Sequence, residues 1–386
     1  MPGYELIGEE EFAEIKHLFD KSKILFRHSF DYIRNNIFKV KEFEEAFANR
    51  MKVPCALGVT SGTAALRVAL ATLGIKEGDE VITQSFTFVA TVEAIIESRA
   101  IPVITEIDKT LNMDPVDLEN KITDKTKAII VVHMLGTPAR LKEIKEIADR
   151  QSIPLIEDTA WGCGGYYDDF PLGTYGDMGT YSFDFAKTMT TGEGGMVVFK
   201  QKHLYEKAAA WHDHGHENNP NFPRWEDSRS SSGFNYRMNE MQGAVGLAQL
   251  KKLDYVVGEQ RKNSNLIKES ISDLPIEMRA VPDGSFETSD ALVFLVDSNQ
   301  IARQCRDALI EAGLGTKILP EAITWHFAGT WGHMPELVKR SRKDLADAYP
   351  VSLDLLNRSV SLPISINMVK EFPSRIREAL ISVLKS

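Results

Sequence analysis

Short apolar segments alternate with amphipathic ones over most of the first 200 residues. Continuous apolar runs at 56–59, 101–105 and 128–132 predict buried strands, and residues 141–150 predict a helix with charged side chains on its outer face. Strands without polar alternation are typical of parallel sheets, because crossover helices cover both faces of such sheets. We therefore expect an α/β fold with a mixed, mostly parallel sheet.

The second half of the chain has a different pattern. Residues 216–233 are rich in Asn, Pro, Ser, Arg and Trp and lack periodicity, which predicts a long ordered loop. A long amphipathic helix is predicted to begin near residue 239. It leads into a C-terminal part that mixes strands and helices. We expect two domains: residues 1–258, with an N-terminal segment and a large domain, and residues 259–386, a smaller α+β domain.

The composition excludes several classes of protein. The net charge of −10 argues against a nucleic acid or an anionic membrane as partner. The three cysteines (Cys55, Cys163 and Cys305) are far apart and show no metal-ligand spacing, so we expect no disulfide framework and no metal site. No apolar run approaches the roughly 18 residues of a membrane span, and no signal peptide is evident. A cytoplasmic protein is expected.

Three short segments could carry chemistry. Residues 60–65 lie between a strand and a helix, where backbone N–H groups favour a phosphate, although an ordinary capped turn is the alternative. Asp158 ends a predicted strand, where it could bind a metal, a ribose or a pyridinium nitrogen, or simply cap a helix. Lys187 lies in a stretch rich in Gly and hydroxyl groups. A buried lysine there would be nucleophilic, whereas a surface-loop lysine would be inert.

Together these segments meet the needs of pyridoxal phosphate (PLP). This cofactor requires a lysine for its Schiff base, an acid for its ring nitrogen and a cradle for its phosphate. Phe88, after a predicted strand at 80–83, could cover the ring. A nucleotide-binding oxidoreductase is disfavoured because no Gly-x-Gly-x-x-Gly element follows a strand. A non-catalytic regulator that binds PLP or a sugar is the alternative from another class, although no DNA-binding module appears.

Five segments, at 60–66, 86–91, 156–158, 190–195 and 233–238, resemble the DegT/DnrJ/EryC1/StrS family. Its members are PLP-dependent transferases of fold type I, mostly aminotransferases of nucleotide-linked keto sugars. The resemblance extends from about residue 9 to the end. It implies that Lys187 binds the cofactor covalently and that Asp158 pairs with the ring nitrogen. It also implies that Phe88 stacks on the ring and that Trp161 lies beside the ring. The residues that would hold the phosphate are Gly62, Thr63 and Ser182.

The resemblance also implies a homodimer with shared active sites, in which Asn235 reaches the phosphate of the neighbouring subunit. Two positions bear on specificity. Trp161 stands where the family often has Gln or His. Lys187 is retained where dehydratases of the family carry His, which favours transamination over sugar dehydration.

Histidines gather at 211–217 and near residue 326. We interpret them as a polar, partly cationic lining for an acidic substrate rather than as metal ligands, because no compatible Cys or Asp spacing accompanies them. The candidate residues for substrate binding are Arg27, His28, Arg229, Arg237 and His326.

The opening residues and the segment 182–187 resemble a narrower group within the family, which forms 8-amino-3,8-dideoxy-manno-octulosonate, a lipopolysaccharide sugar. This resemblance implies transfer of an amino group from L-glutamate to the C8 aldehyde of 8-oxo-3-deoxy-manno-octulosonate. A nucleotide-linked 3- or 4-keto-deoxy sugar is the alternative acceptor.

Overall fold

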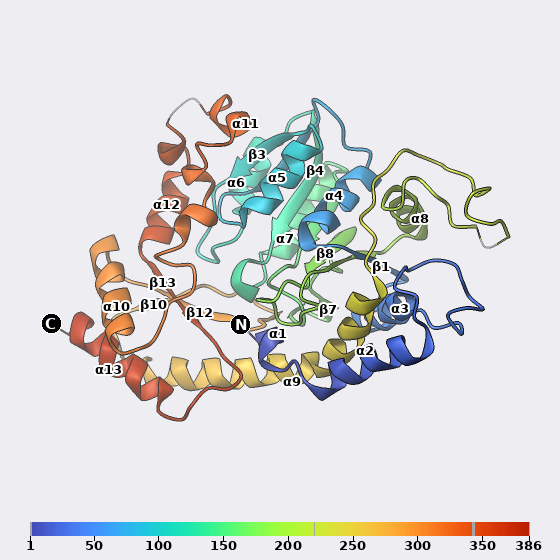
Figure 1. Ribbon diagram of the computed structural model, residues 1–386. Coiled ribbons are helices and arrows are strands. Elements are labelled where there is room, and N and C mark those ends of the chain that lie inside the picture. Colours follow the sequence, from blue (N-terminus) through green and yellow to red (C-terminus); the bar gives the residue numbers. More distant parts are fainter. Residues whose placement is uncertain (1, 220, 342–343, 386) are drawn as a thin grey trace.

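A seven-stranded sheet forms the centre of the computed structural model, which describes residues 2–219, 221–341 and 344–385 (Figure 1). The strand order is β1-β9-β8-β5-β4-β2-β3. Only β9 is antiparallel to its neighbours, so the predicted mostly parallel sheet is confirmed. The strands are β1 (Cys55–Val59), β2 (Glu80–Gln84), β3 (Ile101–Thr105), β4 (Thr126–Val132), β5 (Leu155–Asp158), β8 (Met178–Ser182) and β9 (Gly195–Phe199).

Helices cover both faces of this sheet because its strands present apolar side chains on both. On one face pack α4 (Gly62–Thr72), α5 (Val89–Glu97) and α8 (Lys202–Trp211). On the other pack α3 (Lys39–Met51), α6 (Pro115–Lys121) and α7 (Leu141–Arg150), together with the first half of α9 (Glu240–Ser270). The helix at 141–150 was predicted with these bounds.

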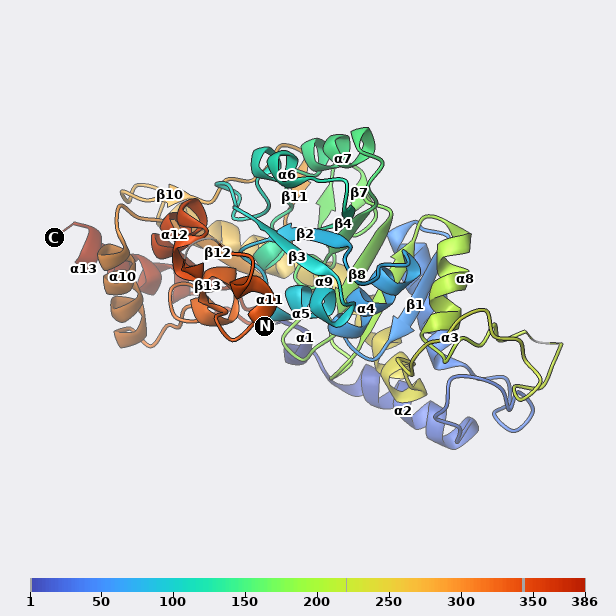
Figure 2. The ribbon, with the colours of Figure 1, turned by 90° about the horizontal axis from the view of Figure 1, so that it is seen from above.

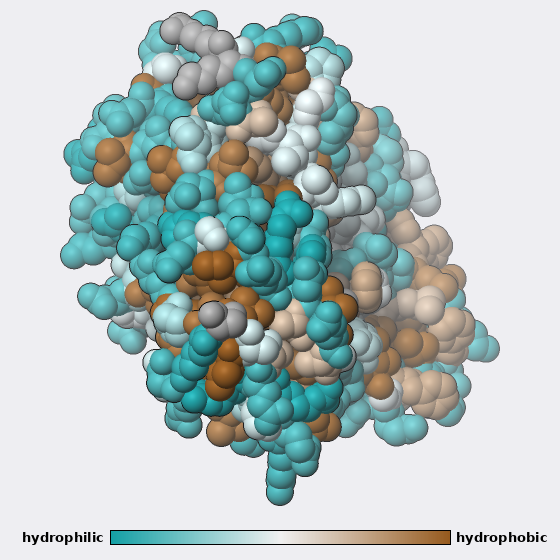
Figure 3. Space-filling view, turned by 90° about the vertical axis from the view of Figure 1, so that its left-hand side faces the viewer, coloured by the Kyte–Doolittle hydropathy of each residue, from teal (hydrophilic) through white to brown (hydrophobic). Residues whose placement is uncertain are grey.

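The C-terminal part has its own core. A three-stranded sheet of β10 (Glu277–Met278), β12 (Ala291–Leu295) and β13 (Ser359–Pro363) packs against α10 (Asn299–Glu311) and α13 (Phe372–Leu384). The predicted domain boundary after residue 258 falls inside α9, which runs from the large domain to α13 (Figure 1). The boundary itself stays a prediction. The outer face of the C-terminal part is largely hydrophilic, with scattered apolar groups (Figure 3).

An apolar interface holds the C-terminal part against the main sheet. From the large domain it includes Phe86, Val132 and Trp161, and from the C-terminal part Val293 and Leu319. From above, α10, α12 (Pro350–Asn357) and α13 lie to one side of the main sheet, and α8 lies to the other (Figure 2). The carboxyl ends of the parallel strands therefore meet a wall built by the smaller domain.

The described residues of 216–233 contain no helix or strand, as the sequence predicts. Asp227 joins the two limbs of this loop, since its carboxylate accepts hydrogen bonds from the N–H groups of Asn218 (2.8 Å) and Asn219 (3.1 Å). Each helix in the described part of the chain is too short or too polar to cross a membrane.

Candidate active site

A cavity of about 310 Å³ lies at the carboxyl ends of the parallel strands. It brings together residues that are far apart in the sequence but were predicted to share one site. Those residues are Gly62, Thr63, Phe88, Asp158, Trp161, Ser182, Lys187 and His326. Asn235 does not line this cavity and is exposed on the chain's surface.

One end of the cavity suits a phosphate. The helix α4 begins there, with Ser61 as its N-cap accepting from the N–H of Ala64 at 3.1 Å. A Cβ atom on Gly62 would lie 2.7 Å from the Cβ of Ser182, so only glycine fits between the start of α4 and the end of β8. This close approach places the free N–H groups of a helix N-terminus beside the hydroxyls of Thr63 and Ser182. Such a cradle fits the phosphate of PLP.

Asp158 is suited to hold a cationic ring nitrogen. It is 5% exposed, and its Oδ2 accepts from Thr91 Oγ1 at 2.9 Å while its Oδ1 accepts from the N–H of Ala160 at 3.2 Å. Burial raises the pKa of Asp158, although these donors and Lys187 oppose the shift. A carboxylate that is desolvated in this way is stabilised by a nearby cation, and a protonated pyridine nitrogen provides one.

Glu157 fixes the end of β5 from behind. Its carboxylate accepts from the N–H groups of Gly173, Tyr175 and Gly176 at 2.6–2.9 Å and faces His133 Nε2 at 2.9 Å. Burial opposes ionisation, but His133 and the N–H groups of Gly176 and Gly173 lower the pKa of Glu157 below its usual value. Glu157 therefore holds the strand end that carries Asp158.

Lys187 follows β8 on a turn in which its N–H donates to the carbonyl of Asp184 at 3.1 Å. Its amine lies 3.6 Å from the centre of the Trp161 ring. Burial lowers the pKa of Lys187 to about 8, although Asp290 and Asp184 oppose this shift. About a tenth of the amines would then be neutral at pH 7, far more than for an exposed lysine. A partly neutral amine is what Schiff-base formation requires.

Two aromatic side chains border the cavity and could contact a flat cofactor. Trp161 is 9% exposed, and Phe88 is 39% exposed. The Phe88 ring stacks with Trp325 at 6.3 Å and packs on His326 at 5.5 Å. The carbonyl of His326 accepts from the N–H of Thr87 at 2.9 Å, which fixes this segment of the smaller domain over the site.

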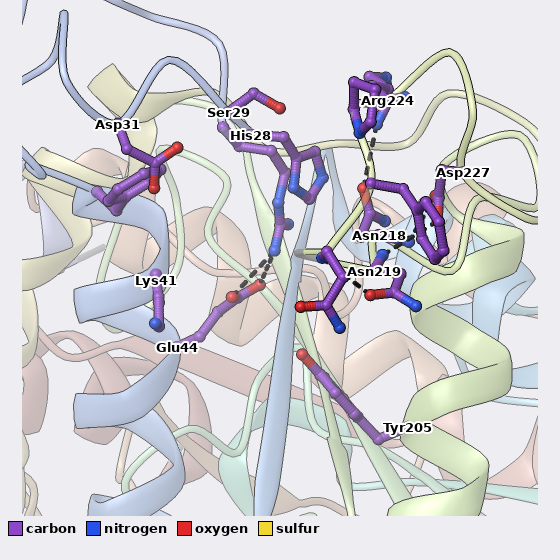
Figure 4. Close-up of a pocket in the computed structure, with 15 residues that line it drawn as sticks. His28, Ser29, Asp31, Lys41, Glu44, Tyr205, Asn218, Asn219, Arg224 and Asp227 are labelled. Atoms are coloured by element: carbon purple, nitrogen blue, oxygen red, sulfur yellow. Dashed lines mark hydrogen bonds and ion pairs between the residues drawn. The ribbon is translucent and has the colours of Figure 1, made fainter.

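Arg27 and His28 do not line this cavity. They border a second, larger one of about 760 Å³, between the residues near 28 and the 216–233 loop (Figure 4). Arg27 donates to both carboxylate oxygens of Glu44, at 2.8 and 3.0 Å, in a buried ion pair. Arg237 pairs with Asp213, and Arg229 is exposed. Within one chain these four residues lie away from the cofactor site, so their substrate roles stay predictions.

The histidines differ from the predicted partly cationic lining. Burial lowers the pKa of His28 to about 3 and also lowers the pKa of His212 and His326. These shifts favour the neutral form of the three side chains at pH 7, and their part in substrate binding stays a prediction. Among the described residues no group of three or more His, Cys, Asp or Glu side chains is placed to bind a metal ion.

Thr91, Asp290 and Lys317 were not predicted as site residues. Thr91 lies in the segment 86–91, but its bond to Asp158 depends on the packing of α5 against the main sheet. Asp290 and Lys317 belong to the smaller domain and form a buried ion pair. Their charges act on Lys187, which no local sequence pattern indicates.

The fold and this site define the class of PLP-dependent aminotransferases of fold type I. The chain belongs to the DegT/DnrJ/EryC1/StrS aminotransferase family, whose sequence model matches residues 32–381. It is 34% identical over 348 residues to GDP-perosamine synthase from Escherichia coli O157:H7, covering 90% of this chain and 88% of that protein.

Two solved structures share the fold over nearly the whole chain. An aminotransferase from Psychrobacter cryohalolentis has a TM-score of 0.85 and 25% identity, covering 98% of this chain and 97% of that chain. DesV from S. venezuelae, in complex with a ketimine intermediate, has a TM-score of 0.84 and 26% identity, covering 99% and 96%. The protein is thus a sugar aminotransferase with PLP as its cofactor.

Proposed function

We propose that the protein transfers an amino group from L-glutamate to the C8 aldehyde of 8-oxo-3-deoxy-manno-octulosonate, in lipopolysaccharide sugar biosynthesis. One observation carries this proposal. The two segments that resemble octulosonate aminotransferases, the opening residues and 182–187, touch each other: the N–H of Gly3 donates to the carbonyl of Lys187 at 2.9 Å. A Cβ on Gly3 would lie 2.7 Å from that oxygen, so the contact requires glycine.

Each residue of the site would have a separate role in amine transfer. PLP, when bound, supplies an electron sink for the negative charge that forms at the donor's α-carbon. Gly62, Thr63 and Ser182 would bind its phosphate, and Asp158 would keep a proton on its ring nitrogen. Lys187 would remove the α-proton from the donor and return a proton nearby, as general base and then general acid, for which a pKa of about 8 is well matched.

The reaction would proceed in two halves through the same site. The donor leaves as its 2-oxo acid, and the sugar carbonyl then takes the amine by the reverse proton transfers at Lys187. Retention of lysine at this position supports amine transfer over sugar dehydration.

A nucleotide-linked 3- or 4-keto-deoxy sugar is the second candidate acceptor. It is favoured by the likeness to the E. coli protein named GDP-perosamine synthase, which spans most of both chains. The two candidates differ in where their negative charge lies: a carboxylate on the sugar itself, or a diphosphate attached to it.

We also propose that two copies of the chain share their active sites. Tyr32 (93% exposed), Trp225 (83%) and Phe234 (58%) belong to the segments 22–38 and 212–239. Both segments lie on the side of the molecule away from the C-terminal part (Figure 1). Large apolar side chains that are exposed on one side of a molecule favour an interface there. Asn235, next to Phe234, would then reach the phosphate bound in the second copy, and the second cavity with Arg27 and His28 would adjoin that copy.

A substrate panel tests the acceptor. Enzyme loaded with the amine form of the cofactor is offered 8-oxo-3-deoxy-manno-octulosonate beside nucleotide-linked 3- and 4-keto sugars, and the aminated products are quantified. We expect kcat/KM for the octulosonate to be higher by at least about 100-fold, a difference of roughly 3 kcal/mol in transition-state binding. A preference for any nucleotide sugar would contradict the proposal and support the second candidate.

A further inference from the structure

A second lysine, Lys317, lies near the half-buried Lys187 and is buried itself. The Nζ of Lys317 is 4.8 Å from the centre of the Trp161 ring, and the Nζ of Lys187 is 3.6 Å from the centre of the same ring. Lys317 is only 9% exposed. Lysine is rarely buried to this degree without a partner, because desolvating its charge is costly.

The partner of Lys317 is Asp290, which is 2% exposed. The Nζ of Lys317 donates to the Oδ2 of Asp290, whereas the Oδ1 of Asp290 is buried without a hydrogen-bond partner. One carboxylate oxygen thus accepts a hydrogen bond, whereas the negative charge on the other oxygen has no hydrogen-bond partner. An unpaired oxygen of this kind acts strongly on any cation nearby, because little water screens it.

Both residues are fixed to the small sheet of the C-terminal part. Asp290 directly precedes β12, and its carbonyl accepts from the N–H of Ile364 at 3.3 Å. The N–H of Lys317 donates to the carbonyl of Ser361 in β13 at 2.8 Å. Trp161, by contrast, belongs to the large domain, in the turn after β5. The ion pair and the ring therefore meet across the apolar interface between the two parts.

The charged groups that act on Lys187 come from both domains. Asp184 and Asp158 belong to the large domain and favour its protonated form. From the small domain, Asp290 favours the protonated form and Lys317 disfavours it. Glu193 also lines the cavity, and His326 is neutral because burial lowers its pKa. The small domain thus contributes two opposed charges.

We propose that Asp290 and Lys317 are positioning residues that set the charge environment of Lys187, and that they tune this amine for proton transfer from across the interface between the C-terminal part and Trp161. This inference rests on the proposed role of Lys187 as the cofactor lysine. The balance between the charges of Asp290 and Lys317 matters because Lys187 must both take and return a proton in each half-reaction. General acid–base catalysis is most efficient when neither protonation state is strongly favoured.

The test is a pH titration of the visible absorbance of the holoenzyme, which reports protonation of the nitrogen that Lys187 contributes. Asp290→Asn removes an anion that stabilises the protonated form, so its titration midpoint should fall. Lys317→Met removes a cation that destabilises that form, so its midpoint should rise. Each shift should be about one pH unit, the size expected for a single charge several ångströms away in a partly screened interior. Lys317→Arg keeps the cation and should titrate like the wild type.

The double variant Asp290→Asn/Lys317→Met leaves no unpaired buried charge and guards against failure of a single variant to fold. Its midpoint should lie within about 0.3 pH unit of the wild type, because the two opposed charges are removed together. A midpoint displaced as far as in either single variant would overturn the proposal. So would single variants whose midpoints move in the same direction, or not at all, while the cofactor remains bound.

Glu240→Gln is the matched control. It breaks another buried ion pair, between Glu240 at the start of α9 and Arg34, both of which have fully buried side chains. It should lower the melting temperature without moving the titration midpoint. If the midpoint of this control moves as far as those of the pair's variants, their shifts reflect general destabilisation and the proposal is wrong. Failure of the proposed function is distinguishable, because Lys187→Ala would then still show the spectrum of lysine-bound cofactor.

Discussion

Lys187→Ala is expected to abolish the visible absorbance of lysine-bound cofactor and to lower the rate of amine transfer by at least about 10³-fold. The amine of Lys187 lies in the cavity wall, 3.6 Å from the centre of the Trp161 ring, and burial lowers its pKa to about 8. Alanine removes both the covalent attachment and the group that moves the proton. Absorbance spectra and single-turnover rates with L-glutamate measure the two losses separately.

Lys202→Ala is a suitable control for this variant. Lys202 is the first residue of α8, and its side chain is 77% exposed and paired with Glu206 on the helix surface. A surface pair of this kind contributes little to stability, so spectrum and rate should match the wild type. Normal turnover of sugar and glutamate by Lys187→Ala would show that the catalytic assignment is wrong.

Asp158→Asn should lower the rate of amine transfer by about 10² to 10³-fold. Asparagine has nearly the same shape and can still accept one of the two hydrogen bonds, from Thr91 or from the N–H of Ala160, but it cannot neutralise a protonated ring nitrogen. The cofactor would then withdraw electrons less effectively, although its phosphate cradle is unchanged. Rate constants for the glutamate half-reaction and the affinity for the cofactor should be measured together.

Thr91→Val is the graded comparison for Asp158→Asn. Valine preserves the volume but removes the hydroxyl that donates to Asp158, a hydrogen bond to a charged group worth about 1.5–3 kcal/mol. The rate should fall by roughly 10-fold. A larger loss for Thr91→Val than for Asp158→Asn, or no loss for Asp158→Asn, would contradict the assignment of Asp158 to the ring nitrogen.

The main sheet could be predicted where the sequence pattern is local. Residues 101–105 and 141–150 have the predicted bounds, because amphipathic periodicity and continuous apolar runs depend on few neighbours. Strand β8 was not predicted. Its residues, Met178–Ser182, mix apolar and polar types, yet all five are buried between β5 and β9. That burial follows from the order of the strands, which no local window contains.

Some residues of the candidate site could also be predicted from the local sequence, and others could not. Asp158 and Lys187 could be predicted as members of one site because Asp158 ends a strand with an apolar pattern and Lys187 lies in a stretch rich in Gly and hydroxyl groups. Lys317 and Asp290 are 27 residues apart, and their approach to Trp161 depends on how the small domain docks. The charge of a side chain also depends on the tertiary structure around it. Burial, followed by the charge of Arg27, lowers the pKa of His28 to about 3 and so favours its neutral form at pH 7.

We propose that this chain transfers an amino group by means of Lys187. The most direct measurement mixes the holoenzyme with L-glutamate in the absence of a sugar acceptor and follows the cofactor spectrum and the release of 2-oxoglutarate. We expect loss of the lysine-bound absorbance and release of one 2-oxoglutarate per bound cofactor, with neither change in Lys187→Ala. Holoenzyme that keeps its spectrum and releases no 2-oxoglutarate, from glutamate or from any other amino donor, would contradict the claim.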